Sequence, residues 1–197
     1  MRSLLSFAAL VASLFFITTV PALAHEGEGL VGGFASGFWH PIGGLDHVVA
    51  MVAVGLWGAV LGAPALWVLP LVFPLVMALG GALGVLGIPV PAVEIGIAAS
   101  GVVLGLMVAL WVRAPIWVAA VLVGIFAIFH GHAHGTELPA AANSIAYAVG
   151  FVIATGLLHI VGIAFGALNG AKWGAWAVRA AGAVIALAGL SFLTGVA

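Results

Sequence analysis

Charged residues are scarce in this 197-residue chain, where Asp, Glu, Lys and Arg together make up 5%, against about 25% in a soluble domain. Hydrophobic residues make up 65%, and the mean hydropathy is +1.40. An ordinary soluble domain is therefore excluded. Four Lys and Arg residues at a formal net charge of -1 also exclude the basic surface that nucleic-acid binding needs. We predict an integral membrane protein whose surroundings are the lipid bilayer.

Cysteine is absent, which excludes disulfides and thiolate metal ligands. Sulfur is then available to a metal only from the four Met residues. Any metal site in this chain is expected to rely on His nitrogen and carboxylate oxygen.

The N-terminus has the three parts of a secretory signal peptide. Arg2 is the basic residue, 4–20 is the apolar stretch, and Ala22-Leu23-Ala24 is the cleavage site. We predict a signal peptide over residues 1–24 and a single membrane domain over 25–197, with His25 at the mature N-terminus. The alternative is a retained first transmembrane helix.

The rest of the chain divides at Pro, Gly and charged residues into stretches of about 20 residues, the length of a transmembrane helix. We predict an all-α membrane bundle of six transmembrane helices, preceded by a re-entrant or interfacial segment at 29–39. Glycines at four-residue spacing, Gly80 with Gly84 and Gly101 with Gly105, indicate close helix packing. The six expected spans are Gly44–Gly62, Ala65–Gly87, Pro91–Trp111, Pro115–His134, Pro139–Gly166 and Trp173–Thr194.

The orientation follows from two signals. A cleaved signal peptide places His25 outside, so that six spans put the links near Arg113 and Lys172 inside, with Arg179 two turns or less from the latter. Basic residues favour the cytoplasmic side, in agreement with this arrangement. We predict a multi-pass protein of the bacterial cytoplasmic (inner) membrane with a periplasmic mature N-terminus.

Ionisable side chains gather at the predicted outer ends of three spans. Such groups are costly within a bilayer and usually mark an ion or proton path, and imidazole with carboxylate suits a divalent transition metal. Because the three clusters are expected at one depth, we predict a single shared site. The clusters are His40, Asp46 and His47; Glu94; and His130, His132, His134 and Glu137.

Spacing refines this prediction. His40 and His47 are seven residues apart, but Pro41 and the following glycines favour a break between them, as in many ion-binding membrane helices. His130 and His134 are four apart, which suits two ligands to one metal. Glu137 follows on the same side if the helix continues that far.

Span five carries polar residues that fall within one half of the predicted helix. Two interpretations are open: they line a route inward from the outer clusters, or they form hydrogen bonds between helices. The residues are Asn143, Ser144, Tyr147, Thr155 and His159.

Three stretches resemble the HupE/UreJ family of nickel or cobalt permeases. Residues 40–47 match its H-x5-D-H signature, residues 91–100 resemble its acidic third-span segment, and residues 129–137 resemble its F-H-G-x-A-x-G-x-E motif. The signal peptide and six spans also fit, so the resemblance covers essentially the whole chain. It implies functional roles for His40, Asp46, His47, Glu94, His130 and Glu137, whereas His132 and His134 occupy variable positions of the motif.

The resemblance implies uptake of Ni²⁺ or Co²⁺ as cargo, with no tightly bound cofactor and no enzymatic activity. It also implies service to the maturation of nickel enzymes, and a homo-oligomer is possible in such a bundle. The chain has no nucleotide-binding motif, so we expect transport driven by an ion gradient, the membrane potential or intracellular trapping. The alternatives are a metal-binding accessory or sensor protein and an intramembrane metallohydrolase. Against the metallohydrolase, the sequence contains no H-E-x-x-H motif, and no base lies beside Ser100 or Ser144 in the sequence.

Overall fold

The computed structural model describes residues 29–138 and 143–196. The predicted signal peptide and His25 lie outside the described residues. Every regular element within the described ranges is helical, which confirms the all-α class. The helices are α2 (Gly29–Gly43), α3 (Leu45–Leu61), α4 (Ala65–Val85), α5 (Val93–Ala109), α6 (Ile116–Thr136), α7 (Ser144–Gly166), the short 3₁₀ helix η2 (Ala167–Gly170) and α8 (Gly174–Thr194).

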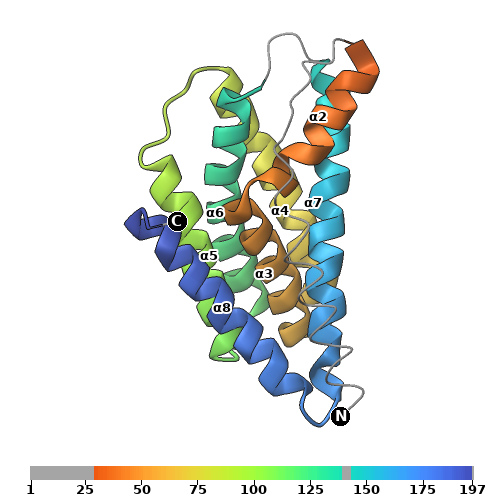
Figure 1. Cartoon of the computed structure of the whole chain (residues 1–197), viewed down its shortest axis with the longest axis vertical. Helices are drawn as coiled ribbons and strands as arrows, with labels where there is room; N and C mark the ends of the chain where they lie inside the picture. Colours follow the sequence, from red (N-terminus) through yellow and green to blue (C-terminus); the bar gives the residue numbers. More distant parts are fainter. Residues whose placement is uncertain (1–28, 139–142, 197) are drawn as a thin grey trace.

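The helices form a bundle in which consecutive members from α3 to α8 run in opposite directions (Figure 1). α4 packs along α6, α5 along α8, and α7 along both α2 and α3. α3 also contacts α4, α5 and α8, and side chains such as Met51, Leu56 and Trp57 make it the buried centre of the bundle.

Helix length and composition support a multi-pass membrane protein. Four described helices are long and apolar enough to cross a membrane, and α2 with α3 adds a fifth if this bent pair is one span. The remaining predicted span contains α5, which has 17 residues, or about 26 Å at 1.5 Å per residue. That is short for a hydrocarbon core of about 30 Å. Four or five candidate spans are therefore present by this criterion, rather than six.

The outer surface of the bundle is apolar. Leu71, Leu75 and Leu79 on α4 are each more than half exposed. Exposed apolar side chains of this kind match a surface that faces lipid. The bilayer therefore accounts for apolar surface that would be unfavourable in water.

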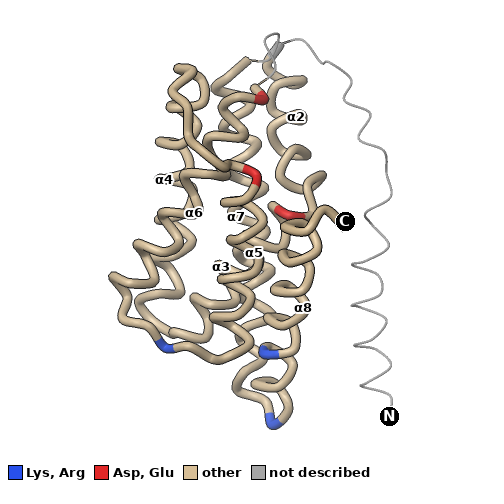
Figure 2. Tube along the Cα trace, turned by 90° about the vertical axis from the view of Figure 1, so that its left-hand side faces the viewer, with Lys and Arg blue, Asp and Glu red and all other residues tan. Residues whose placement is uncertain are grey.

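The charged residues are separated along the bundle. The described Lys and Arg residues, Arg113, Lys172 and Arg179, lie at one end, and the described Asp and Glu residues lie toward the other (Figure 2). The separation agrees with the prediction that the basic residues lie at the end opposite the acidic ones. The acidic residues themselves lie at different heights in Figure 2, so the predicted common depth is not confirmed. We refer below to the acidic end and the basic end.

The chain bends between α2 and α3, where the predicted break lies. The two helices meet at an angle of 81°, and Gly44 between them has an extended backbone, with φ -96° and ψ 111°. His40 therefore lies on one arm of the bend and His47 on the other, so that their relative position is set by the bend and not by helical periodicity.

Close helix contacts form at the spaced glycines, as predicted. A Cβ added at Gly80 or Gly84 would meet the backbone of Ile128 or His132 on α6. A Cβ at Gly105 would lie 2.5 Å from the Ala186 nitrogen on α8. These glycines allow the backbones of paired helices to approach closely.

We expect Gly105→Ala to destabilise the protein by about 1–3 kcal/mol, the usual range for overpacking. The added methyl group cannot fit unless α5 and α8 separate. Gly156→Ala on α7 is the matched control, because an added Cβ there meets nothing within 4 Å. Thermal melting in detergent should show a lower midpoint for the first variant only, and equal midpoints would contradict the α5–α8 contact.

Candidate metal centre

Two overlapping groups of side chains place one ligand atom from each member within 4.8 Å of the others. The first group is His47, His130 and His134, and the second is His40, His134 and Glu137. They come from α2, α3, α6 and the residue that follows α6. Because His134 belongs to both groups, the five residues form one assembly, called here the histidine cluster.

The rings of the cluster are close to one another. The ring centroids of His47 and His134 are 4.5 Å apart, those of His40 and His134 are 4.8 Å apart, and those of His47 and His130 are 4.9 Å apart. His40 Nε2 lies 3.3 Å from Glu137 Oε2. α6 continues through its glycines to Thr136, which keeps Glu137 beside the helix face that carries His130 and His134.

Asp46 orients the His47 ring. Its Oδ1 accepts a hydrogen bond from the His47 backbone N–H at 2.9 Å and lies 2.7 Å from His47 Nδ1. An ionised carboxylate only accepts hydrogen bonds, so Nδ1 carries the proton and Nε2 carries the lone pair. His47 Nε2 is buried, and no described residue forms a hydrogen bond with it. Carboxylate–imidazole pairs of this kind commonly fix the tautomer of a metal-binding His.

Ser100 orients the His130 ring in the same way. The Ser100 hydroxyl donates to the Ile97 carbonyl at 2.6 Å and lies 2.9 Å from His130 Nε2. Because its hydrogen is used, the hydroxyl oxygen accepts the Nε2–H of His130. The lone pair of His130 is then on Nδ1, which is buried and has no partner within the described ranges.

His134 completes the set. Its side chain is buried, and neither of its ring nitrogens has a hydrogen-bond partner in the described part of the chain. A buried polar atom left without a partner costs about 1–3 kcal/mol. Three neighbouring imidazoles that keep lone pairs free in this way are the donor set that a borderline divalent metal prefers. The residues present therefore fit a divalent transition-metal cation.

We expect Ser100→Ala to weaken metal binding by about tenfold, which is the lower end of the usual cost of removing a hydrogen-bond partner of a metal ligand. The variant leaves every residue of the histidine cluster in place but removes the acceptor that holds the His130 tautomer. Ser191→Ala on α8 is the control, because its hydroxyl donates only to the Ala188 carbonyl of its own helix. Equilibrium dialysis with Ni²⁺ in detergent measures both variants, and unchanged affinity in Ser100→Ala would show that this hydrogen bond does not prepare His130.

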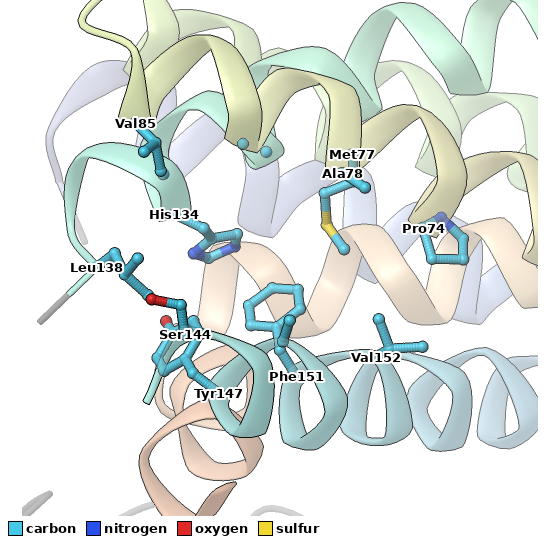
Figure 3. A pocket seen from close by; sticks show the side chains of 14 residues that line it. Pro74, Met77, Ala78, Val85, His134, Leu138, Ser144, Tyr147, Phe151 and Val152 are labelled. Atoms are coloured by element: carbon cyan, nitrogen blue, oxygen red, sulfur yellow. The ribbon is translucent and has the colours of Figure 1, made fainter. Parts of the chain in front are cut away.

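An apolar cavity of about 270 Å³ lies beside the cluster, between α4, α6 and α7. His134 faces it together with Tyr147 and Phe151 (Figure 3), and the ring centroids of His134 and Phe151 are 4.4 Å apart. The lining offers few polar atoms, so the cavity itself is not a binding site for a hydrated ion. It instead keeps one side of the cluster apolar.

Three of the predicted site residues lie outside the cluster: Asp46, which holds the His47 ring, and Glu94 and His132. Glu94 is exposed in the first turn of α5 and belongs to neither group. His132 Nε2 lies 2.9 Å from the Ile88 carbonyl oxygen. Because a carbonyl only accepts, Nε2 carries the proton and donates it. His132 is two residues from both His130 and His134, about 200° round the helix at 100° per residue, so it points away from them.

Three of the polar residues predicted on span five are buried. Tyr147, Thr155 and His159 each have a side-chain polar atom that has no hydrogen-bond partner among the residues the structure describes. Within those residues, the interpretation as hydrogen bonds between helices is not supported for them. Asn143 and Ser144 are exposed, and the Asn143 side chain accepts from the Ala146 N–H at the start of α7.

Sequence reasoning did not find two residues that contact the cluster. The sequence shows Ser100 only as the last residue of the 91–100 segment and as a serine with no base beside it. Nothing in that neighbourhood indicates contact with His130, which is 30 positions away. Phe73 is fully buried on α4, and its ring centroid lies 5.5 Å from that of His130. No sequence signal distinguishes it from other apolar residues of that span.

The chain matches a known family over nearly its full length. The family described as HupE / UreJ protein matches residues 13–192. The chain is also 48% identical over 177 residues to Protein HupE of Rhizobium leguminosarum bv. viciae, covering 89% of this chain and 93% of that protein. No solved structure matches it. The resemblance seen in the motifs is confirmed, and the chain belongs to the HupE/UreJ family.

Proposed function

We propose that the protein is a secondary permease that carries Ni²⁺, or Co²⁺, inward across the cytoplasmic membrane. The observation that supports this proposal most directly is the histidine cluster. There the buried His130 and His134 and the partly buried His47 present ring nitrogens that have no partner among the described residues, within an apolar bundle. Nitrogen and oxygen donors of this kind suit late divalent metals of the first row. The proposal extends to six transmembrane passes formed by α3 to α8, with the short α5 completed by its flanking turns.

The charges of the bundle favour a cation at the cluster and an inward direction. Asp46 and Glu137 supply two carboxylates, which offset the charge of a divalent ion as it loses water. The described basic residues lie at the opposite end (Figure 2), which the positive-inside tendency assigns to the cytoplasm. The cluster then opens toward the periplasm, where the mature N-terminus is also proposed to lie.

The membrane potential is a sufficient driving force for this direction. Moving one charge through 100 mV is worth about 2.3 kcal/mol, so a divalent cation gains about 4.6 kcal/mol on entering a negative interior. We therefore propose transport without ATP hydrolysis, with the imported metal supplied to the maturation of nickel enzymes.

The hydrolase alternative is weakened by the geometry around Ser100. Although Ser100 does contact a His, its hydroxyl donates to the Ile97 carbonyl and accepts from His130. A serine nucleophile instead donates its proton to the base. Ser100 is also fully buried and does not line the cavity beside the cluster.

The test is metal uptake into proteoliposomes that contain a nickel-sensitive fluorescent chelator. With an inside-negative potential we expect uptake by the unaltered protein and none above background by His47→Ala, provided that this variant is folded and monodisperse. Binding in detergent without uptake in liposomes would identify a sensor or accessory protein instead. Uptake that is unaffected by His47→Ala would remove the histidine cluster from the mechanism.

A further inference from the structure

A second pair of buried polar groups lies deeper in the bundle than the histidine cluster. His159 is 1% exposed and Thr155 is 0% exposed, and both lie on α7 one helical turn apart. Both ring nitrogens of His159 and the hydroxyl oxygen of Thr155 are buried and have no hydrogen-bond partner among residues 29–138 and 143–196. Native proteins rarely leave such groups unsatisfied, and each one calls for a water molecule, an ion or a functional role.

This pair lies on the path from the cluster toward the basic end. Phe151 contacts His134, and His159 is eight residues further along α7, or about 12 Å at 1.5 Å per residue. α7 continues through η2 toward Lys172 at the basic end (Figures 1 and 2). His159 therefore lies between the cluster and the end proposed to face the cytoplasm.

One aromatic side chain separates the two sets of histidines. The Phe73 ring centroid is 5.5 Å from that of His130, and it is also 5.5 Å from that of His159, with the latter rings nearly perpendicular at 83°. Phe73 is fully buried. Pro70 and Pro74 flank it within α4, and since Pro has no N–H, each removes one helical hydrogen bond. The segment that carries Phe73 is therefore less strongly held than an uninterrupted helix.

We propose that His159 and Thr155 form a second, inner station for the transported divalent cation, which the Phe73 ring separates from the histidine cluster. This inference rests on the proposed permease function. An imidazole nitrogen and a hydroxyl oxygen replace part of the hydration shell of the ion after it leaves the cluster. The small number of ligands keeps affinity low, as release toward the cytoplasm requires. The Phe73 ring must turn aside for the ion to pass. In the position observed for this ring, the two stations are therefore separated from each other.

The first test compares binding with transport in His159→Leu. We expect Ni²⁺ affinity in detergent, which reports on the intact histidine cluster, to change by less than about twofold, while the uptake rate at saturating Ni²⁺ falls by about tenfold or more. Thr155→Val should reduce the rate by less than His159→Leu, and Gly156→Ala on the same helix is the packing control. Unchanged uptake in folded His159→Leu would overturn the proposal, as would a parallel loss of affinity, which would show that His159 acts only through the cluster.

A second measurement does not require transport or a variant at position 159. Co²⁺ is titrated onto the His47→Ala/His134→Ala protein in detergent, and the imidazole signals are followed by NMR. We expect paramagnetic shift and broadening of the His159 signals, absent when the diamagnetic ion Mg²⁺ is used. No effect of Co²⁺ on those signals would overturn the inner station even if the protein transports metal. If the unaltered protein shows no uptake, the permease function fails, and this titration alone decides whether His159 takes a cation.

Discussion

Replacing His134 by Ala is expected to weaken Ni²⁺ binding by about 100-fold or more. Losing a residue that only hydrogen-bonds to a metal ligand already costs up to about 100-fold, and losing the ligand itself should cost at least as much. Uptake should fall to background. His134 is the only member shared by the two described groups of candidate ligands, so its loss breaks both. Equilibrium dialysis and liposome uptake measure the two effects, and thermal melting confirms that the variant is folded.

His132→Ala provides the matched comparison for that variant. It removes the same side chain from the same helix, two residues away, at a position whose ring is held by the Ile88 carbonyl. The geometry predicts a much smaller loss of affinity than in His134→Ala. If His132→Ala loses as much affinity, the ligands are not those that lie together in the cluster. Unchanged binding in His134→Ala would lead to the same conclusion.

Asp46→Asn is expected to abolish uptake and to weaken Ni²⁺ binding by about 10- to 100-fold. The amide oxygen of Asn still accepts a hydrogen bond from His47 Nδ1, so the ring orientation is largely kept while the negative charge is lost. The variant therefore isolates the effect of the negative charge. It lowers the basicity of the His47 lone pair and removes one of the two carboxylates that balance the charge of the ion.

Glu94→Gln makes the same change of charge at an exposed position outside the cluster. The geometry predicts a smaller loss of affinity there than in Asp46→Asn, although the family resemblance gives Glu94 a functional role. A comparable loss of binding would bring Glu94 into the first binding step. Loss of uptake with binding intact would place its role later in transport. Normal uptake by correctly inserted Asp46→Asn would exclude the carboxylate from the mechanism.

Several features of the fold were predictable because they depend on local sequence. Long apolar runs bounded by Pro and Gly gave helices close to the expected places, as in the second span, predicted at Ala65–Gly87 and observed at Ala65–Val85. The break after His40 follows from Pro41 and the glycines that follow it. The number of spans was less predictable. The third span was predicted from Pro91 to Trp111, but the regular helix there occupies only Val93–Ala109 and is short for a membrane span.

The candidate site was predictable in outline and not in detail. Spacing places His130 and His134 on one face of a helix, and the structure shows this. His132 was predicted to belong to the same site, whereas in the structure it lies outside the histidine cluster. Spacing does not indicate that His134 would join two groups of ligands, since that depends on how α2, α3 and α6 are rotated against one another. The contacts of Ser100 with His130, and of Phe73 with both His130 and His159, also arise between helices far apart in sequence.

The sequence by itself determined that this is an all-helical membrane protein with its few ionisable groups at the ends of apolar runs, because hydrophobic length and helical periodicity are properties of a continuous segment. Only the tertiary structure decided which of those groups share a site, which hydrogen bonds leave nitrogen lone pairs free, and which aromatic ring lies between the outer cluster and His159. Those features depend on the 81° bend and on glycine contacts that set how closely helices approach. Both act between segments, so no single segment encodes them.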